Sequence, residues 1–290
     1  MTPSASVWMQ AARPATLPAA VAPVLVGTAA AGAFVPWRMA AAMAVGLAFQ
    51  VGVNFANDYF DGVRGVDTEQ RVGPRRAVAT GQVAPEAMRA AMGVAFAVAL
   101  AAGLSLAIAV GWELVVVGLA CLAAALGYSG GPRPYASAGL GEVFVFATFG
   151  LVATAGSAYV QDATLPGEIW PAATAMGVLA SALLMVNNLR DLPTDAGVGK
   201  RTLAVRLGDP AARRAYAALL VVGFAMVPLI AMARPGLAPL LGLLALPLAV
   251  SPIRAVLRGA TGTALITVLR ATGRLHLVFG ILLTAGFVLS

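Results

Sequence analysis

The chain has 290 residues, of which 60% are hydrophobic and 11% are charged, and its formal net charge is +7. Ordinary soluble domains carry about 25% charged residues, so this composition excludes a water-soluble protein and indicates one that crosses a membrane repeatedly. The apolar runs are apolar on every face, which favours helices over the alternating strands of a membrane barrel, and no soluble basic domain is left to bind nucleic acid.

A transmembrane helix needs about 20 apolar residues. By this measure the sequence contains nine predicted spans, at residues 17–36, 39–57, 90–110, 112–129, 139–160, 168–189, 212–232, 236–252 and 274–290. The eighth is the weakest, because it is short and contains three prolines. We predict an all-α polytopic membrane protein with nine transmembrane helices. Because no long linker divides the chain, we expect a single domain over residues 1–290.

The distribution of basic residues supports the division into nine spans, since Lys and Arg collect in cytoplasmic loops. With nine spans and a cytoplasmic N-terminus, 17 of the 19 basic residues fall on the cytoplasmic side, and only Arg38 and Arg234 lie on the other. We therefore expect a multi-pass protein of the cell (cytoplasmic) membrane, the inner membrane where there are two. The positive charge then reflects topology and attraction to anionic lipid headgroups.

A cluster of amide and carboxylate side chains ends the second predicted span, in the sequence NFANDYFDGVRGVD. Asn54, Asn57, Asp58 and Asp61 are separated by three or four residues, which places all four on one stripe of a helix. Asp67 follows beyond GVRG, where the chain can bend back. This stripe would face the interior of the bundle at the cytoplasmic side.

A similar cluster, NNLRDLPTDAGVGKR, ends the sixth predicted span. Asn188, Asp191 and Asp195 share one helical face, and Asn187 lies one turn before Asp191. Pro193 interrupts the regular pattern, so we expect Asp195 to lie just past a kink. The two clusters stand nearly half the chain apart, which suggests two related halves that face each other.

Clustered carboxylates near membrane depth need a compensating cation, because each costs up to about 2.5–3.5 kcal/mol on insertion scales. Asp and Asn offer hard oxygen ligands that suit Mg²⁺, which usually completes its shell with substrate phosphates. Basic residues that could bind such an anion follow each cluster; they are Arg71, Arg75, Arg76, Lys200 and Arg201. The residues thus predict a cytoplasm-facing site for a magnesium-bound, phosphate-bearing ligand. The alternative is that both clusters are helix ends in water.

Several stretches resemble the UbiA superfamily of intramembrane aromatic prenyltransferases. NDYFDGVRGVD looks like its first Asp-rich motif and NNLRDLPTD like its second. Three further stretches, RPATLPAAVAPVLVGTA, RVGPRRAVATGQVAP and YSGGPRPYASAGLGEVFVFATFG, point to the branch of 1,4-dihydroxy-2-naphthoate polyprenyltransferases. The likeness covers roughly residues 13–215 in order.

This resemblance implies a nine-helix bundle around a central cavity, in which Mg²⁺ and a polyprenyl diphosphate lie between the two motifs. The implied catalytic and metal-binding residues are the aspartates Asp61, Asp67, Asp191 and Asp195, with Asn57 and Asp58 as further metal ligands. The candidates for binding diphosphate or substrate are Arg13, Asn54, Asn57, Arg71, Tyr128, Arg133, Asn188 and Lys200. Tyr128 would stabilise an allylic cation or orient the acceptor; alternatively, it is an anchor at the membrane interface.

The implied reaction is Mg²⁺-dependent transfer of a polyprenyl group to 1,4-dihydroxy-2-naphthoate, with loss of the ring carboxylate, giving demethylmenaquinone for menaquinone biosynthesis. One alternative is a relative with another acceptor, such as 4-hydroxybenzoate, a chlorin or a phosphoribosyl group. Another is a membrane ion transporter, in which carboxylates line an ion path. A conducting path should show polar groups through the full depth of the membrane, whereas the acids here gather at one face. The sequence leaves prenyl length and oligomeric state open.

Overall fold

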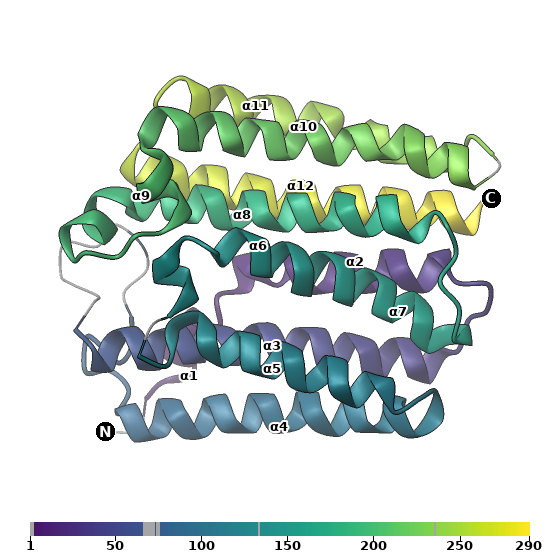
Figure 1. The fold of residues 1–290 in the computed structure, drawn as a ribbon. Coiled ribbons are helices and arrows are strands. Elements are labelled where there is room, and N and C mark those ends of the chain that lie inside the picture. The colour runs from purple at the N-terminus through teal and green to yellow at the C-terminus, as the bar shows by residue number, and fades with distance from the viewer. Residues whose placement is uncertain (1–2, 66–72, 74–75, 133, 235) are drawn as a thin grey trace.

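The computed structural model describes residues 3–65, 73, 76–132, 134–234 and 236–290. Across this described part every regular element is helical (Figure 1). The elements are α1 (Ala5–Ala12), η1 (Pro14–Thr16), α2 (Pro18–Ala30), α3 (Pro36–Val63), α4 (Pro85–Ala109), α5 (Glu113–Ser129), η2 (Tyr135–Ala138), α6 (Gly141–Val145), η3 (Phe146–Val152), α7 (Ala153–Asp162), α8 (Ile169–Gly197), α9 (Leu203–Leu207), α10 (Asp209–Ala233), η4 (Ala238–Ala245), α11 (Leu246–Leu257) and α12 (Gly262–Val288).

Within these ranges, seven helical segments are long and apolar enough to cross a membrane. They are α3, α4, the continuous run of α6, η3 and α7, then α8, α10, the run of η4 and α11, and α12. The first and fourth predicted spans are also apolar helices, but α2 has 13 residues and α5 has 17. Each of the nine predicted spans therefore coincides with a helix in the described residues, although two are shorter than a full crossing.

The last predicted span begins twelve residues too late. We placed its start at residue 274, whereas α12 begins at Gly262 and runs for 27 residues. The stretch with Arg270 and Arg274 reads as a basic loop in the sequence, but it forms the first turns of α12, where long basic side chains can reach polar surroundings. Arg270 lines the main cavity of the bundle.

The centre of the bundle is α8, which packs against α2, α6, α7, η3, α10 and α12. The preceding span contains a π-helical turn, η3, and such turns occur frequently at functional sites. There α8 approaches so closely that a side chain at Gly150 would collide with the backbone of Gly177, and one at Gly177 would collide with Phe146. Both glycines are therefore needed for this contact.

The two Asp-rich motifs lie at one end of the bundle, and Arg38 and Arg234 lie at the other, as the sequence predicts. At one end Arg234 pairs with Glu168 (Nη1 to Oε1, 3.4 Å) and Arg38 donates to the carbonyl oxygens of Val160 and Gln161. The opposite end, on the left of Figure 1, holds the C-terminal ends of α3 and α8 together with α9. Both Asp-rich motifs therefore end on the same side of the protein.

Candidate active site

A cavity of about 490 Å³ lies where the ends of α3 and α8 meet η1, α5 and α12. Side chains of both motifs line it; those predicted from the sequence are Arg13, Asn54, Asn57, Asp58, Asp61, Tyr128, Asn187, Asn188, Asp191, Asp195 and Lys200. The predicted residues Asp67, Arg71, Arg75 and Arg133 lie outside the described residues. The cavity thus gathers the described candidates into one site, except Arg201, which is exposed and does not line it.

The first motif forms the last turns of α3. Asn54, Asn57, Asp58 and Asp61 are all buried, each less than 9% exposed, and they share one face of this helix. The predicted stripe is therefore confirmed. The four side chains of this stripe nevertheless have different hydrogen-bond partners.

Asp58 lines the cavity and also binds backbone groups. Its Oδ2 accepts from the amide of Ala77 at 3.1 Å and its Oδ1 from the amide of Val78 at 2.9 Å. These bonds hold the chain that leads into α4 against the end of α3. A role for Asp58 as a metal ligand stays a prediction, and its present contacts favour an anchoring role instead.

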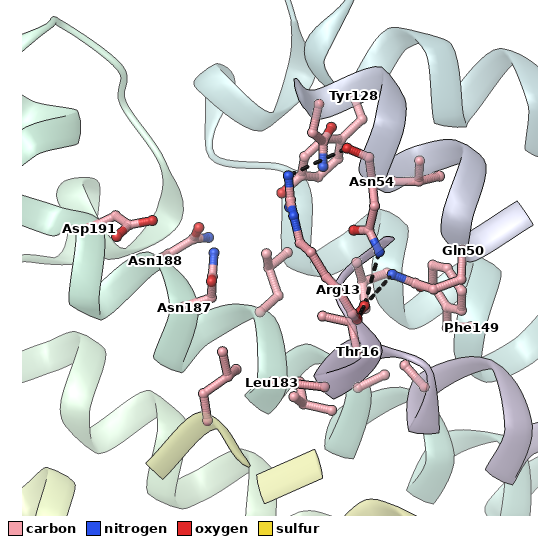
Figure 2. A pocket seen from close by; sticks show the side chains of 18 of the residues that line it. Arg13, Thr16, Gln50, Asn54, Tyr128, Phe149, Leu183, Asn187, Asn188 and Asp191 are labelled. Carbon is pink, nitrogen blue, oxygen red and sulfur yellow. Dashed lines mark hydrogen bonds between the residues drawn. The ribbon is translucent and has the colours of Figure 1, made fainter. Parts of the chain in front are cut away.

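Asn54 fastens the N-terminal segment to α3. Its Nδ2 donates to the carbonyl oxygen of Ala12 (2.8 Å) and to Oγ1 of Thr16 (3.1 Å), and Nε2 of Gln50 donates to the same hydroxyl (3.0 Å). The Arg13 guanidinium in turn donates to the carbonyl oxygen of Asn54 at 3.4 Å. Arg13 therefore lies on the α3 side of the cavity, with its guanidinium beside Tyr128, opposite Asn187 and Asn188 of α8 (Figure 2).

The second motif continues α8 past the membrane span. We expect a kink at Pro193; the helix continues through Pro193 to Gly197, so Asp191 and Asp195 stay on one helix. Arg190 holds Asp191 by two bonds, Nε to Oδ1 at 2.7 Å and Nη2 to Oδ2 at 2.6 Å.

Lys200 joins the two motifs. Its Nζ lies 3.7 Å from Oδ2 of Asp61 and 4.0 Å from Oδ1 of Asp195. The chain reverses just before it at Gly199, which has a positive φ of 76°, and the amide of Lys200 donates back to the carbonyl of Asp195 at 2.9 Å. Arg76 adds a second cation 3.7 Å from Asp61. Carboxylates from the two motifs therefore meet around one ammonium.

Aromatic rings form another wall of the cavity. Tyr128 meets Tyr135 edge to face, with ring centroids 5.5 Å apart, and Tyr135 stacks on Phe144 at 3.9 Å. The Tyr135 hydroxyl donates to the carbonyl of Ala124 at 2.6 Å, and burial raises the pKa of this phenol above its usual range. Tyr128 lines the cavity, so its ring faces the candidate site rather than anchoring the outer surface.

Two features of the site escaped the sequence analysis. One is the hydrogen-bonded pair of Arg190 and Asp191, which the adjacent letters RD in the motif do not predict. The other is Glu142, a buried carboxylate on α6 whose Oε1 accepts from Nδ2 of Asn188 at 3.0 Å. A lone acid at the start of an apolar span was the available signal, because such residues in membrane helices are usually functional.

The donor set fits a hard cation better than a soft one. In the part of the chain that the structure describes, no three His, Cys, Asp or Glu side chains gather closely enough to form a metal centre by themselves. The cavity instead combines Asp61, Asp191 and Asp195 with amide side chains, and oxygen ligands of this kind suit Mg²⁺ that keeps water or phosphate in its shell. The neighbouring Arg and Lys side chains neutralise the carboxylates and match a phosphate group.

The cavity becomes apolar away from the aspartates and adjoins a second one of about 320 Å³. Both cavities are lined by Phe49, Thr148 and Phe149, so these side chains, here called the neck, lie between them. The second cavity lies among α3, α4, α5 and α7, and its lining includes Leu100 and Leu119, which are exposed on the outer surface. A ligand with a polar head and an apolar tail matches this arrangement.

Comparisons with known proteins agree with the geometry. Residues 20–270 match the model of the UbiA prenyltransferase family. Two similar proteins are named 1,4-dihydroxy-2-naphthoate octaprenyltransferase, one from Mycobacterium tuberculosis (43% identical, 94% of each chain covered) and one from Escherichia coli K12 (37% identical, 98% of this chain and 95% of the relative).

Two solved structures share the fold. A UbiA homologue from Aeropyrum pernix matches with a TM-score of 0.68 at 18% identity, over 95% of this chain and 96% of that one. A UbiA homologue from Archaeoglobus fulgidus bound to GPP and Mg²⁺ matches with a TM-score of 0.66 at 16% identity, over 96% and 99%. On this evidence the chain belongs to the UbiA prenyltransferase family and is a multi-pass membrane protein.

Proposed function

We propose that this protein transfers a polyprenyl group from polyprenyl diphosphate to 1,4-dihydroxy-2-naphthoate, with loss of the carboxylate, to give demethylmenaquinone in its reduced (quinol) form. The relatives at 43% and 37% identity carry the name of this activity. One structural observation carries the proposal for this chain: Lys200 joins Asp61 to Asp195 at the polar end of a cavity that adjoins an apolar one.

The diphosphate would bind at the polar end. Lys200, Arg76 and Arg13 face the cavity and can each donate to phosphate oxygens. Asp61, Asp191 and Asp195 would hold Mg²⁺, which when bound would offset the negative charge of the departing diphosphate. Loading the site would release Lys200 from the two carboxylates and let it contact the diphosphate.

The chemical step breaks the C–O bond between the allylic carbon and the diphosphate, and the ring carbon of the naphthoate that bears the carboxylate then forms the new C–C bond. The ring carboxylate leaves as CO₂, so that the aromatic diol is restored. Tyr128 and Phe144 line the cavity beside this reaction centre and can stabilise positive charge through their ring faces. The enclosing apolar walls exclude water, which would otherwise capture the allylic cation as an alcohol.

The distal isoprene units would pass the neck at Phe49, Thr148 and Phe149 and occupy the second cavity. We further propose that the end of the bundle with both motifs faces the cytoplasm, as does the N-terminus. This orientation rests on the excess of Lys and Arg at that end. The donor's tail could then remain in the lipid bilayer while its headgroup reaches the site from inside.

A reconstitution experiment tests this function. Purified protein is incubated with farnesyl or octaprenyl diphosphate, Mg²⁺ and one acceptor at a time, namely 1,4-dihydroxy-2-naphthoate, 4-hydroxybenzoate, a chlorin or a phosphoribosyl compound. We expect pyrophosphate release and a decarboxylated prenyl product, detected by mass spectrometry, only with the naphthoate. Product from another acceptor instead would reassign the substrate, and ion flux in liposomes without any prenyl transfer would favour a transporter.

A further inference from the structure

Glu142 is a carboxylate that the reaction described above does not use. It lies on α6, is 6% exposed, and sits beside the cavity rather than in its wall. Burying an acid in an apolar region is unfavourable unless the group makes compensating bonds. Its contacts therefore indicate what it does.

Glu142 connects α6 to α8 at two positions. Its Oε1 accepts from Nδ2 of Asn188 at 3.0 Å, and its backbone oxygen accepts from the hydroxyl of Ser181 at 3.0 Å. The second carboxylate oxygen, Oε2, is buried and has no hydrogen-bond partner among the described residues. A group kept only for stability would be expected to satisfy both oxygens, because a buried unpaired acceptor costs about 1–3 kcal/mol.

The bond to Glu142 decides which way the Asn188 amide points. Because Nδ2 of Asn188 is the donor in this bond, Asn188 turns its NH₂ group toward Glu142. Its Oδ1 is then directed away from Glu142. Asn188 lines the cavity beside Asp191, and in Figure 2 its side chain lies on the α8 side, facing Arg13 and Asn54. Asn188 therefore offers an oxygen to the cavity.

The corresponding asparagine of the first motif is held by a hydroxyl group. Asn57 uses its Oδ1 to accept from the Ser129 hydroxyl at 2.7 Å. An amide oxygen has two lone pairs, so this bond leaves Asn57 able to bind a cation as well.

We propose that Glu142 is a positioning residue that holds Asn188 with its amide oxygen toward the cavity, as a ligand for the divalent cation. This gives Asn188 a metal-binding role where the sequence assigned it to substrate binding, and it rests on the proposed function. Residues that orient a metal ligand typically change metal affinity 10–100-fold when replaced.

The test compares Mg²⁺ binding with stability. Mg²⁺ is titrated into the purified full-length protein without substrate, its half-saturating concentration is read from the shift in Tm, and prenyl transfer is measured separately. For Glu142→Leu we expect the half-saturating Mg²⁺ concentration to rise roughly tenfold or more, while the Tm without Mg²⁺ is unchanged or higher, because an unpaired buried oxygen is removed.

The exchanged pair Glu142→Gln with Asn188→Asp provides the matched control. In this double variant the new amide on α6 can donate to the new carboxylate on α8 and again direct an oxygen into the cavity. Mg²⁺ binding should then return to within about threefold of the original, whereas Asn188→Asp alone places two carboxylates together and should not restore it. A lower Tm with unchanged Mg²⁺ binding in Glu142→Leu, or no recovery in a folded exchanged pair, would overturn the proposal. Because binding is read without substrate, a wrong acceptor assignment leaves this result intact.

Discussion

The two Asp-rich motifs look alike in sequence but are tied into the protein differently. In the first, Asn54 and Asp58 bind backbone groups of neighbouring segments, Ala12 on one side and Ala77 and Val78 on the other. In the second, Asp191 and Asn188 are held by the side chains of Arg190 and Glu142. The first motif therefore organises the chain around the site, and the second orients ligands within it.

The largest effects are expected at the carboxylates that both motifs contribute to the cavity, one from each motif. Asp61→Asn and Asp191→Asn should each lower prenyl transfer on the order of 100-fold or more, because each removes negative charge from the proposed cation site. The measurement is product formation under saturating Mg²⁺, with the Tm as a check on folding. Near-normal turnover in either variant would remove that residue from the site.

The next test concerns Lys200, whose ammonium group joins the two motifs. Lys200→Met removes the ammonium between Asp61 and Asp195, and we expect the KM for polyprenyl diphosphate to rise roughly tenfold, as for loss of one charge-assisted bond. The matched control is Arg201→Met, because Arg201 is adjacent and its side chain is exposed. Equal effects of the two substitutions on KM would show that general positive charge matters, not the position of Lys200.

The sequence predicted the spans, the shared end of the bundle and the helical stripes because these depend on local patterns of polarity. It did not predict that Asp58 would bind the amides of Ala77 and Val78, since that contact depends on how the chain returns to α3. The start of α12 was missed for a related reason. Arg270 is charged but turns toward the cavity, and hydropathy alone reads such a residue as part of a loop.

A substitution at Asp58 tests whether this residue of the first motif anchors the backbone or binds the cation. Asp58→Asn replaces one accepting oxygen with an NH₂ group that faces a backbone amide, so we expect a loss of about 1–3 kcal/mol in the free energy of unfolding. The half-saturating Mg²⁺ concentration should stay within about twofold of the original, whereas Asp61→Asn should raise it. Thermal unfolding with and without Mg²⁺ measures both quantities. If Asp58→Asn weakened Mg²⁺ binding as much as Asp61→Asn, the anchoring role would be wrong.

The smallest expected effect lies at the far end of the site, at the neck between the two cavities. Phe149 is nearly buried there, on the π-helical turn η3, and Phe149→Ala should widen the passage. We expect the ratio of kcat/KM for octaprenyl over farnesyl diphosphate to change about fourfold to fifteenfold, since one or two methylene contacts are worth about 0.8 kcal/mol each. Val116→Ala, on the exposed face of α5, is the control and should leave the ratio unchanged. Because Phe149 carries no oxygen ligand for a cation, Mg²⁺ binding should not respond. An unchanged ratio together with weaker Mg²⁺ binding would show that Phe149 affects binding of the polar head and not of the tail.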